Sequence, residues 1–320
     1  MRPLRTVVFL AACFAFGTAS AEWPERSVRI VAPFAPGGTA DTLGRLVAAH
    51  LSERLKQSFV VENKPGAGGA VGSELVAKSD PDGYTFVVSG IASHVIAPNL
   101  PRGTPYDPLK DFTHIALFGG PPAVFAVNPD LPAKTLKEFV ALAKSQPGKL
   151  TYGSPGNGTQ GQLVAELFKR EAGIDLVHVP YKGASRAVQD LLGGQISSVS
   201  TTLTTASGQI KGGRARGLAL SSAKRLADYP DIPTFAEQGY PNIIGTVWFS
   251  LSGPAGVPAD IVNKLNAEVR AALKSPQVRE RVRHDGIEPN DLDARQFTAF
   301  VAEELKRWAP IVKASGAKND

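Results

Sequence analysis

Apolar and β-branched positions gather into short runs along this chain, and helical patterns separate most of the runs. Apolar residues in the helical patterns recur at the spacing of one buried helix face, as at Leu43, Val47 and Leu51. Ten runs are typical of strands, and they cover residues 28–33, 59–63, 85–90, 114–119, 123–129, 149–155, 175–181, 195–200, 216–222 and 246–253. Because strands and helices alternate, the pattern predicts an α/β protein with parallel sheets.

The carboxyl-terminal part of the chain has a different pattern. Residues 259–274, 277–284 and 294–314 have helical periodicity, and no strong strand pattern occurs among them. We therefore expect the chain to finish by wrapping helices around a sheet that is formed earlier.

A strand followed by a Pro-Gly turn, a Thr and a helix occurs twice. The two turns are residues 36–39 (PGGT) and 155–159 (PGNGT), and a third turn of similar kind covers 180–185 (PYKGAS). Two lobes with one such turn each would explain the repetition. The connections between the lobes are then expected near 119–123, where GGPPA interrupts two strand patterns, and near 240–247.

These connections define the predicted domain organisation. Lobe 1 is expected to be discontinuous and to comprise residues 22–121 and 246–320, while lobe 2 comprises residues 122–245. A chain of 320 residues, 43% hydrophobic and 20% charged, is long enough for two such cores.

The first 21 residues are predicted to be a secretory signal peptide. Arg2 and Arg5 precede the apolar stretch 6–17, and small residues follow up to Ala21, after which cleavage is expected. An alternative is a lipoprotein signal processed at Cys13. The exported chain would be periplasmic, and after cleavage at Ala21 it has no cysteine, so neither disulfides nor thiol catalysis are available to it.

Net charge gives little support for a nucleic-acid partner. The formal charge of +6 falls to +4 when Arg2 and Arg5 are removed, leaving 33 basic and 29 acidic residues. Lys and Arg are dispersed, and no basic block with interleaved aromatic residues occurs.

The first Pro-Gly turn, within residues 34–41 (FAPGGTAD), has the chemistry of an anion site. Backbone N–H groups at the start of a helix have no intrahelical acceptor, and the helix dipole is positive there. Gly37 and Gly38 would allow an anion to approach the backbone closely. The alternative is that Thr39 only caps the helix while Asp41 complements its dipole, with no ligand bound.

Residues 156–161 (GNGTQG) match the G-x-G-x-x-G pattern of dinucleotide sites, but the pattern is incomplete. The next strand should end in an acidic residue for the ribose hydroxyls, whereas Asp175 stands at its beginning. We therefore expect no nucleotide cofactor.

Catalytic and metal-binding motifs were not found. The chain has no G-x-S-x-G elbow, P-loop or H-E-x-x-H sequence, and its five histidines lack the spacing of metal ligands. His94 is of interest because it follows Ser93 just after a predicted strand, where α/β proteins bind ligands. Lys182 either pairs with a carboxylate or is simply solvated.

Several longer motifs together resemble a known family. They include WPERSVRIVAPFAPGGTAD, VENKPGAGGAVGSELVAKSDPDGYTFV, YGSPGNGTQGQLVAELF, VPYKGASRAVQDLLGGQI and PDIPTFAEQGYP. The sequence is similar to the extracytoplasmic solute-binding proteins of tripartite tricarboxylate transporters, the Bug family, over essentially the whole mature chain. The resemblance implies a type II periplasmic-binding-protein fold: two α/β lobes, a hinge, and a small carboxylate bound in the cleft.

The resemblance also implies the role and the site. A receptor of this kind delivers its ligand to membrane permease subunits; we expect a monomer that is not an enzyme and has no cofactor. Ligand carboxylates in the family are held largely by main-chain N–H groups, hydroxyls and waters. The implied ligand-binding residues are Phe34, Pro36, Gly37, Gly38, Asp41, Ser93, His94, Ser154, Gly156, Asn157, Thr159, Tyr181 and Thr201.

One departure from the family pattern concerns residues 193–202 (GGQISSVSTT). Many relatives have two aspartates there, and this chain has hydroxyl side chains. A plain carboxylic acid is therefore expected in preference to an amino acid. The alternative function is an exported α/β hydrolase that uses a cleft hydroxyl such as that of Ser154.

Overall fold

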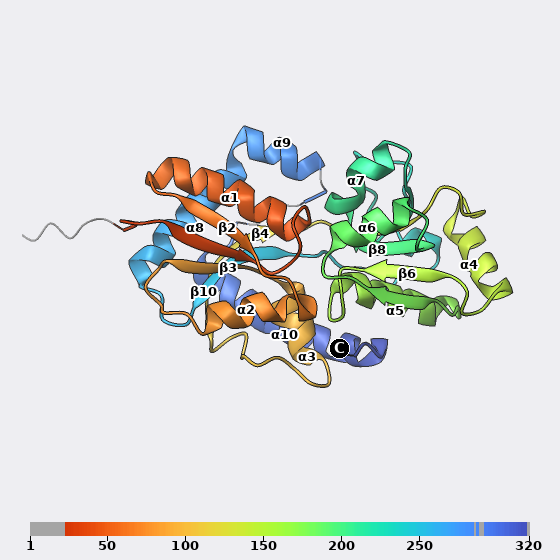
Figure 1. Ribbon diagram of the computed structural model, residues 1–320, viewed down its shortest axis with the longest axis horizontal. Helices are drawn as coiled ribbons and strands as arrows, with labels where there is room; N and C mark the ends of the chain where they lie inside the picture. Colours follow the sequence, from red (N-terminus) through yellow and green to blue (C-terminus); the bar gives the residue numbers. More distant parts are fainter. Residues whose placement is uncertain (1–22, 285, 288–290, 319–320) are drawn as a thin grey trace, which may run out of the picture.

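The computed structural model describes residues 23–284, 286–287 and 291–318. The predicted signal peptide and the alternative site at Cys13 lie outside these residues. The strands form two five-stranded sheets with the orders β2-β1-β3-β10-β4 and β7-β6-β8-β5-β9. Each sheet is the centre of one of two α/β lobes that lie side by side (Figure 1).

Every run predicted to be a strand overlaps one in the structure. The strands are β1 (Val28–Ala32), β2 (Phe59–Asn63), β3 (Thr85–Gly90), β4 (Phe112–Gly119), β5 (Ala123–Val127), β6 (Thr151–Ser154), β7 (Val177–Pro180), β8 (Ser198–Thr202), β9 (Arg216–Leu220) and β10 (Phe249–Pro254). Because β1–β4 and β10 belong to one sheet and β5–β9 to the other, the chain crosses between the lobes twice. The lobe boundaries themselves stay a prediction.

Helices connect the strands. They are α1 (Thr39–Leu55), α2 (Ala70–Ala77), α3 (Ala97–Asn99), α4 (Leu136–Ser145), α5 (Gln160–Ala172), α6 (Ala184–Leu192), α7 (Leu203–Lys211), α8 (Ala259–Lys274), α9 (Pro276–His284) and α10 (Ala294–Ser315). Short helical turns are η1 (Ala67–Gly69), the π-helical η2 (Ala92–Ile96) and η3 (Ala236–Gln238).

The expectation of parallel sheets is wrong for two strands. β1 is parallel to β2 and β3, and β6 is parallel to β7 and β8. β10 is antiparallel to β3 and β4, and β5 is antiparallel to β8 and β9. The reason is that β5 and β10 enter their sheets from the other lobe, without the helical crossover that makes neighbouring strands parallel.

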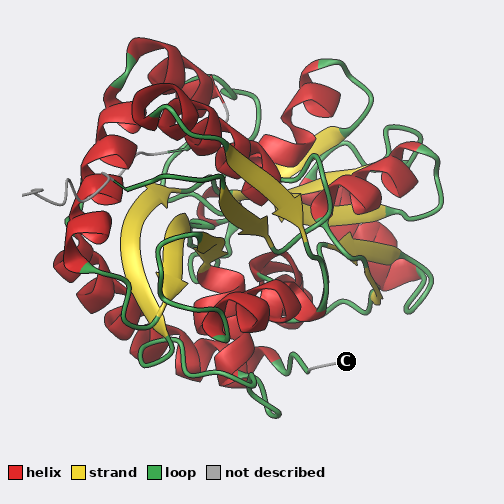
Figure 2. Cartoon of the chain, turned by 60° about the vertical axis from the view of Figure 1, so that its left-hand side comes forward, coloured by secondary structure: helices red, strands yellow, loops and turns green. Residues whose placement is uncertain are grey.

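Both faces of each sheet are covered by helices (Figure 2). In lobe 2 the side chains of β5 alternate between two cores, as the period of two along a strand requires. Phe125 packs on one face with Phe139 of α4 and Phe168 of α5. Val124 packs on the other face with residues of α6 and α7, such as Leu191.

The carboxyl-terminal helices pack against the first sheet, as expected. Both α8 and α10 contact β4. α10 also reaches lobe 2 (Figure 1): it contacts α5, Ile311 packs against the cores of both lobes, and the Arg170 guanidinium donates a hydrogen bond to the Ala314 carbonyl. None of the helices in the described part of the chain is both long and apolar enough to cross a membrane.

The two segments that cross between the lobes pair with each other. Pro122 and Thr246 form an antiparallel bridge, and the Val247 N–H donates to the Pro121 carbonyl at 2.8 Å. This adjacency is the arrangement expected of a hinge.

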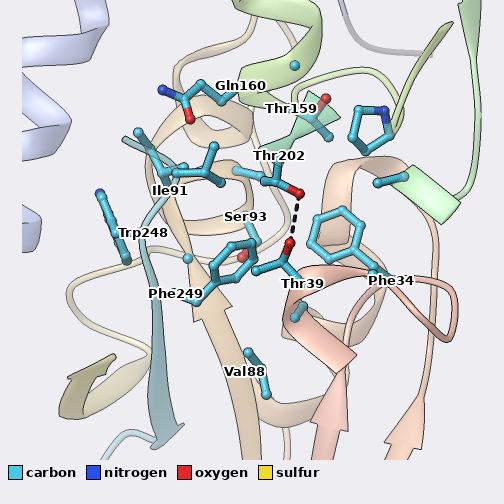
Figure 3. A pocket seen from close by; sticks show the side chains of 18 residues that line it. Phe34, Thr39, Val88, Ile91, Ser93, Thr159, Gln160, Thr202, Trp248 and Phe249 are labelled. Atoms are coloured by element: carbon cyan, nitrogen blue, oxygen red, sulfur yellow. Dashed lines mark hydrogen bonds between the residues drawn. The ribbon is translucent and has the colours of Figure 1, made fainter. Parts of the chain in front are cut away.

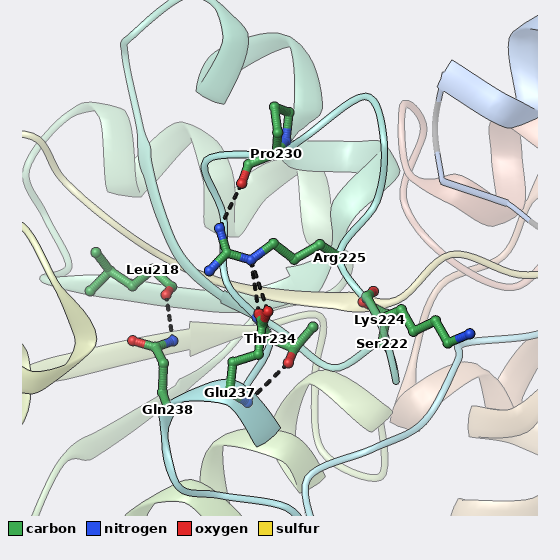
Figure 4. A network of polar contacts seen from close by, with 8 residues as sticks. All are labelled: Leu218, Ser222, Lys224, Arg225, Pro230, Thr234, Glu237 and Gln238. Atoms are coloured by element: carbon green, nitrogen blue, oxygen red, sulfur yellow. Dashed lines mark hydrogen bonds and ion pairs between the residues drawn. The ribbon is translucent and has the colours of Figure 1, made fainter.

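Polar contacts order the long segment that leads from β9 to the second crossing (Figure 4). Arg225 Nε lies 3.0 Å from both carboxylate oxygens of Glu237, and Arg225 Nη1 donates to the Pro230 carbonyl at 2.8 Å. Glu237 also accepts from the Thr234 N–H at 2.7 Å. These contacts hold residues 225–237 together within one loop segment.

Candidate ligand-binding site

Four helices begin at one cavity between the lobes. Their N-cap residues are Gly38 for α1, Thr159 for α5, Gly183 for α6 and Thr202 for α7. The residues of these turns that line the cavity are Gly38, Thr39, Ala40, Thr159, Gln160, Gly161, Ala184 and Thr202. Because the first N–H groups of each helix have no intrahelical acceptor and the dipole is positive there, the cavity favours an anion.

The other walls of this cavity, called the inner cavity below, are apolar. Phe34, Val88, Ile91, Trp248 and Phe249 lie around it (Figure 3). Its volume is about 40 Å³, and none of its 18 lining residues carries a charged side chain or an imidazole. An anion in the inner cavity would therefore be balanced by backbone dipoles rather than by an ion pair.

A second cavity of about 250 Å³, the outer cavity, lies next to the inner one. Phe34 and Pro155 line both cavities and so form the wall between them. The outer cavity is otherwise lined by residues 66–69, 156–157 and 180–182, and Lys182 is the only charged residue among them.

The lobes contact each other directly across this site. The Ala35 N–H donates to the Lys182 carbonyl at 3.2 Å, and Ser185 Oγ donates to the Pro36 carbonyl at 2.8 Å. Residues 180–185, the third turn noted in the sequence, thus bind the first turn. Hydrogen bonds therefore join the two lobes at this edge of the site.

The first turn is shaped by Asp41, which lines neither cavity. Its carboxylate accepts hydrogen bonds from the Gly37 N–H, Asn63 Nδ2 and Arg45 Nε, each at 3.0 Å. Burial raises the pKa of the Asp41 carboxyl, but the hydrogen bonds from Arg45, Gly37 and Asn63 outweigh it and hold this pKa below its usual value. The Asp41 carboxylate is occupied by these three hydrogen bonds within lobe 1, so this geometry does not support the expectation that Asp41 contacts a ligand.

Thr39 has a different role from the capping role considered as the alternative. The N-cap of α1 is Gly38, without a side-chain cap. The Thr39 hydroxyl instead lies 2.7 Å from the Thr202 hydroxyl of lobe 2. In lobe 2, Thr159 does cap its helix: its Oγ1 accepts from the Gln162 N–H at 3.4 Å and donates to the Gly156 carbonyl at 2.7 Å.

Ser93 lines the inner cavity, whereas the adjacent His94 lies behind it. Ser93 Oγ is 2.9 Å from His94 Nδ1. The imidazole is fully buried against Tyr106, Phe112 and His114. Burial, and to a lesser extent His114, lower the pKa of His94 well below its usual value, so the ring is neutral near pH 7. His94 positions the Ser93 hydroxyl and does not face either cavity.

Ser154 is buried beneath the second turn and lines neither cavity. Its Oγ accepts from the Gly156 N–H at 3.2 Å and lies 2.7 Å from His178 Nε2. The His178 ring stacks on Tyr152 at 4.6 Å between centroids. This Ser-His pair shapes the loop and lies outside the inner and outer cavities.

The predicted site residues fall into four groups. Phe34, Gly38, Ser93 and Thr159 line the inner cavity. Phe34 also lines the outer cavity, together with Gly156, Asn157 and Tyr181. Pro36, Gly37 and Tyr181 line a groove at the mouth of the cleft. Asp41, His94, Ser154 and Thr201 line none of these three spaces.

Sequence reasoning missed residues that come from distant parts of the chain. Trp248 and Phe249 line the inner cavity because β10 inserts between β3 and β4. Thr202 lines it in place of Thr201, its neighbour in β8. Gln160 was noted only as part of a glycine pattern, although its place directly after a helix N-cap was a usable signal. In the described part of the chain, no group of three or more His, Cys, Asp or Glu side chains could hold a metal ion.

The fold and the site together define a two-lobed solute-binding protein of the periplasmic-binding-protein type II class. The family model described as "Tripartite tricarboxylate transporter family receptor" matches residues 43–317. This chain therefore belongs to the family of tripartite tricarboxylate transporter receptors.

Individual relatives agree with this assignment. Protein BugT of Bordetella pertussis is 34% identical over 313 residues, which cover 97% of this chain and 96% of BugT. The solved structure of R. palustris Rpa4515 with adipate has a TM-score of 0.89 and 35% identity, covering 93% of this chain and 99% of that one. MatC from Rhodopseudomonas palustris with bound malate has a TM-score of 0.86 and 33% identity, covering 91% of this chain and 100% of that one.

Proposed function

We propose that this protein is a monomeric periplasmic receptor that closes its lobes on a small carboxylate and delivers it to the permease subunits of a tripartite tricarboxylate transporter. The observation that carries the proposal is the convergence of four helix N-termini on a cavity without charged side chains: one helix, α1, comes from lobe 1, and three, α5, α6 and α7, come from lobe 2. Such a cavity suits a carboxylate, because its charge is met by N–H groups once both lobes have closed.

Family membership supports the same ligand class. One solved relative is described with adipate and another with bound malate. Export to the periplasm is supported by the predicted signal peptide with cleavage after Ala21. The receptor needs no cofactor and catalyses no reaction in this proposal, and the comparisons give no support to the hydrolase alternative.

A thermal-shift screen of the exported, processed protein tests the proposal. The panel comprises mono-, di- and tricarboxylates, aromatic acids and amino acids. A ligand at about one hundred times its Kd adds about 2.7 kcal/mol to the free energy of unfolding, which raises the Tm measurably. A flat panel with folded protein stripped of co-purified ligand would overturn the proposal.

Gly38→Val provides a variant for the same screen. A Cβ at Gly38 would meet only the Ala35 carbonyl at 3.5 Å, an ordinary contact, and the φ of −83° suits any residue. The fold should therefore tolerate the change, while the valine narrows the approach to the first N–H groups of α1. We expect an unchanged Tm without ligand and a reduced shift with carboxylates.

A further inference from the structure

Five polar side chains line the inner cavity, and four of them already have hydrogen-bond partners. The Thr39 and Thr202 hydroxyls bond to each other, Ser93 bonds to the His94 ring, and Thr159 bonds to backbone groups of its own turn. Gln160 is the exception. Neither its Oε1 nor its Nε2 has a hydrogen-bond partner among the described residues.

The Gln160 amide is also deeply buried. The residue is 1% exposed and is the first residue of α5. Buried amides without partners are rare in folded proteins, and each needs an explanation. Here Gln160 is one of the residues that line the cavity in which we propose that a ligand binds.

Two indole N–H groups near Gln160 already have an acceptor. Trp248 and Trp308 both donate their indole N–H to Glu304 Oε2, at 3.0 and 3.1 Å. Beside the amide, Gly245 presents no side chain: a Cβ there would lie 2.9 Å from Gln160 Nε2 and 3.3 Å from the Trp308 ring. The indole N–H groups of Trp248 and Trp308 are therefore not available to the Gln160 amide.

Gln160 lies at one end of the inner cavity. Figure 3 shows it with Ile91 and Trp248 on one side, with Phe34 on the opposite side. Phe34 forms the wall toward the outer cavity, and Gln160, which is 1% exposed, lines the inner cavity away from that wall. A ligand that fills the inner cavity therefore presents one of its ends to the Gln160 amide.

The chemistry of an amide selects among possible ligand ends. Nε2 donates and Oε1 accepts, so a matching group must both accept and donate. A hydroxyl or a carboxamide satisfies both atoms. A second carboxylate accepts only and leaves Oε1 without a donor. An ammonium donates only and is disfavoured by the positive helix ends, and an alkyl end leaves both atoms unpaired.

We propose that Gln160 is a specificity residue, and that the receptor selects carboxylates whose other end is a neutral group that donates and accepts hydrogen bonds, a hydroxyl or a carboxamide. This inference rests on the proposed function as a carboxylate receptor. It assigns the charge of the ligand to the helix N-termini and its second polar group to the Gln160 side chain.

Two matched series of acids test the inference by isothermal titration calorimetry. The six-carbon series is hexanoate, 6-hydroxyhexanoate, adipamate, adipate and 6-aminohexanoate; the four-carbon series is butanoate, 4-hydroxybutanoate, succinamate, succinate and 4-aminobutanoate. In the series whose length fits, we expect the hydroxyl and carboxamide members to bind at least about ten-fold more tightly than the other three members.

Gln160→Met and Gln162→Met are the matched variants. Gln162 is also buried, but its Oε1 accepts from the Gly158 N–H at 2.8 Å and its Nε2 donates to Asn157 at 3.2 Å. Gln160→Met should remove the preference for hydroxyl and carboxamide ends without lowering the Tm of the unliganded protein. Gln162→Met should lower the Tm of the unliganded protein and weaken the binding of all the acids by a similar factor.

The outcomes separate the two proposals. If no member of either series and no acid of the wider panel binds, the proposed function fails. If acids bind but their affinities do not depend on the group at the far end, the receptor function stands and the role of Gln160 is refuted. The same holds if Gln160→Met weakens the binding of all the acids equally.

Discussion

Thr39 Oγ1 and Thr202 Oγ1 lie 2.7 Å apart although the residues are 163 positions apart in the chain and belong to different lobes. Thr205 Oγ1 completes the cluster, at 3.3 Å from Thr39 and 3.0 Å from Thr202. Both Thr39 and Thr202 line the inner cavity and begin helices. Closure of the lobes and formation of the ligand site are thus linked through one hydrogen bond.

Removing the hydrogen bond between the Thr39 and Thr202 hydroxyls should weaken ligand binding. Thr202→Val keeps the side-chain shape and removes the hydroxyl, including its 3.0 Å contact with Thr205 Oγ1, but Thr202 makes no side-chain cap to the backbone of α7. Because a neutral hydrogen bond contributes about 0.5–1.5 kcal/mol, we expect the Kd to rise about two- to ten-fold. Calorimetry with the tightest acid of the panel measures this change.

Thr135→Val is the control for Thr202→Val. Thr135 caps α4 by accepting from the Glu138 N–H, remote from both cavities. Its loss should lower the free energy of unfolding by about 1 kcal/mol and leave the Kd unchanged. Equal Kd values for wild type and Thr202→Val would contradict the role given to the Thr39–Thr202 bond.

Gly68 should control closure through close approach of the lobes. A Cβ at Gly68 would lie 2.4 Å from the Asn157 carbonyl of lobe 2, so Gly68→Ala should hold the lobes apart. We expect at least about ten-fold weaker binding and no ligand-induced decrease of the radius of gyration in small-angle X-ray scattering.

The matched control for Gly68→Ala is Gly173→Ala. Both glycines have a φ of +62°, so alanine brings the same backbone strain, but nothing lies within 4 Å of a Cβ at Gly173. This variant should lose stability and still close on its ligand. If ligand decreases the radius of gyration of Gly68→Ala as much as that of the wild type, the contact with Asn157 does not limit closure.

Local patterns predicted the strands well because each strand is a compact apolar or β-branched run between turns. They could not give the direction of β5 and β10, which depends on how the chain crosses between lobes. They also could not separate Thr201 from Thr202, because neighbouring strand residues point to opposite faces and the site residue is set by where β8 ends.

The turns were the part of the site that sequence could predict. Gly38 and Thr159 were identified from the strand-turn-helix pattern, and the structure brings both to the inner cavity. Trp248 carries no such pattern, since its place depends on the insertion of β10 between β3 and β4. The turns can be predicted because their backbone chemistry depends on neighbouring residues in the sequence. The apolar walls cannot, because they depend on the order of the strands in the sheet.

Asp41 should contribute more to stability than a residue that only complements a helix dipole. Asp41→Asn removes the charge that Arg45 pairs with and replaces an acceptor facing three donors by a group that also donates. We expect a loss of about 1–3 kcal/mol in urea unfolding at pH 7, against about 0.3–1 kcal/mol for a dipole effect alone.

Asp260→Asn is the control, because Asp260 is an exposed acidic residue in the first turn of α8. Since the pKa of Asp41 is lowered in the folded protein, its stabilisation is present above the unfolded pKa of about 3.9 and is lost as the pH falls through the folded pKa. Similar losses in the free energy of unfolding for Asp41→Asn and Asp260→Asn at pH 7 would show that the hydrogen bonds to Asp41 add no stability.

His114 should make lobe 1 sensitive to mild acid. Its Nε2 lies 3.0 Å from the Pro108 carbonyl and its Nδ1 lies 3.1 Å from Ser252 Oγ. Burial lowers the pKa of His114 to about 4, although the hydrogen bond to Pro108 partly opposes the shift. In the unfolded chain the pKa is about 6.5, so between pH 6.5 and 4 the unfolded state binds a proton that the folded state does not.

The free energy of unfolding should therefore fall as the pH decreases through this window, by up to about 3 kcal/mol from His114. His114→Gln keeps a donor and an acceptor but cannot titrate. Urea unfolding at pH 7, 6, 5 and 4.5 should show lower stability of the variant at pH 7 but a shallower decline toward pH 4.5. The buried His94 is present in both proteins and contributes to both slopes in the same direction. Parallel slopes for the variant and the wild type would mean that His114 accepts its proton without unfolding of lobe 1.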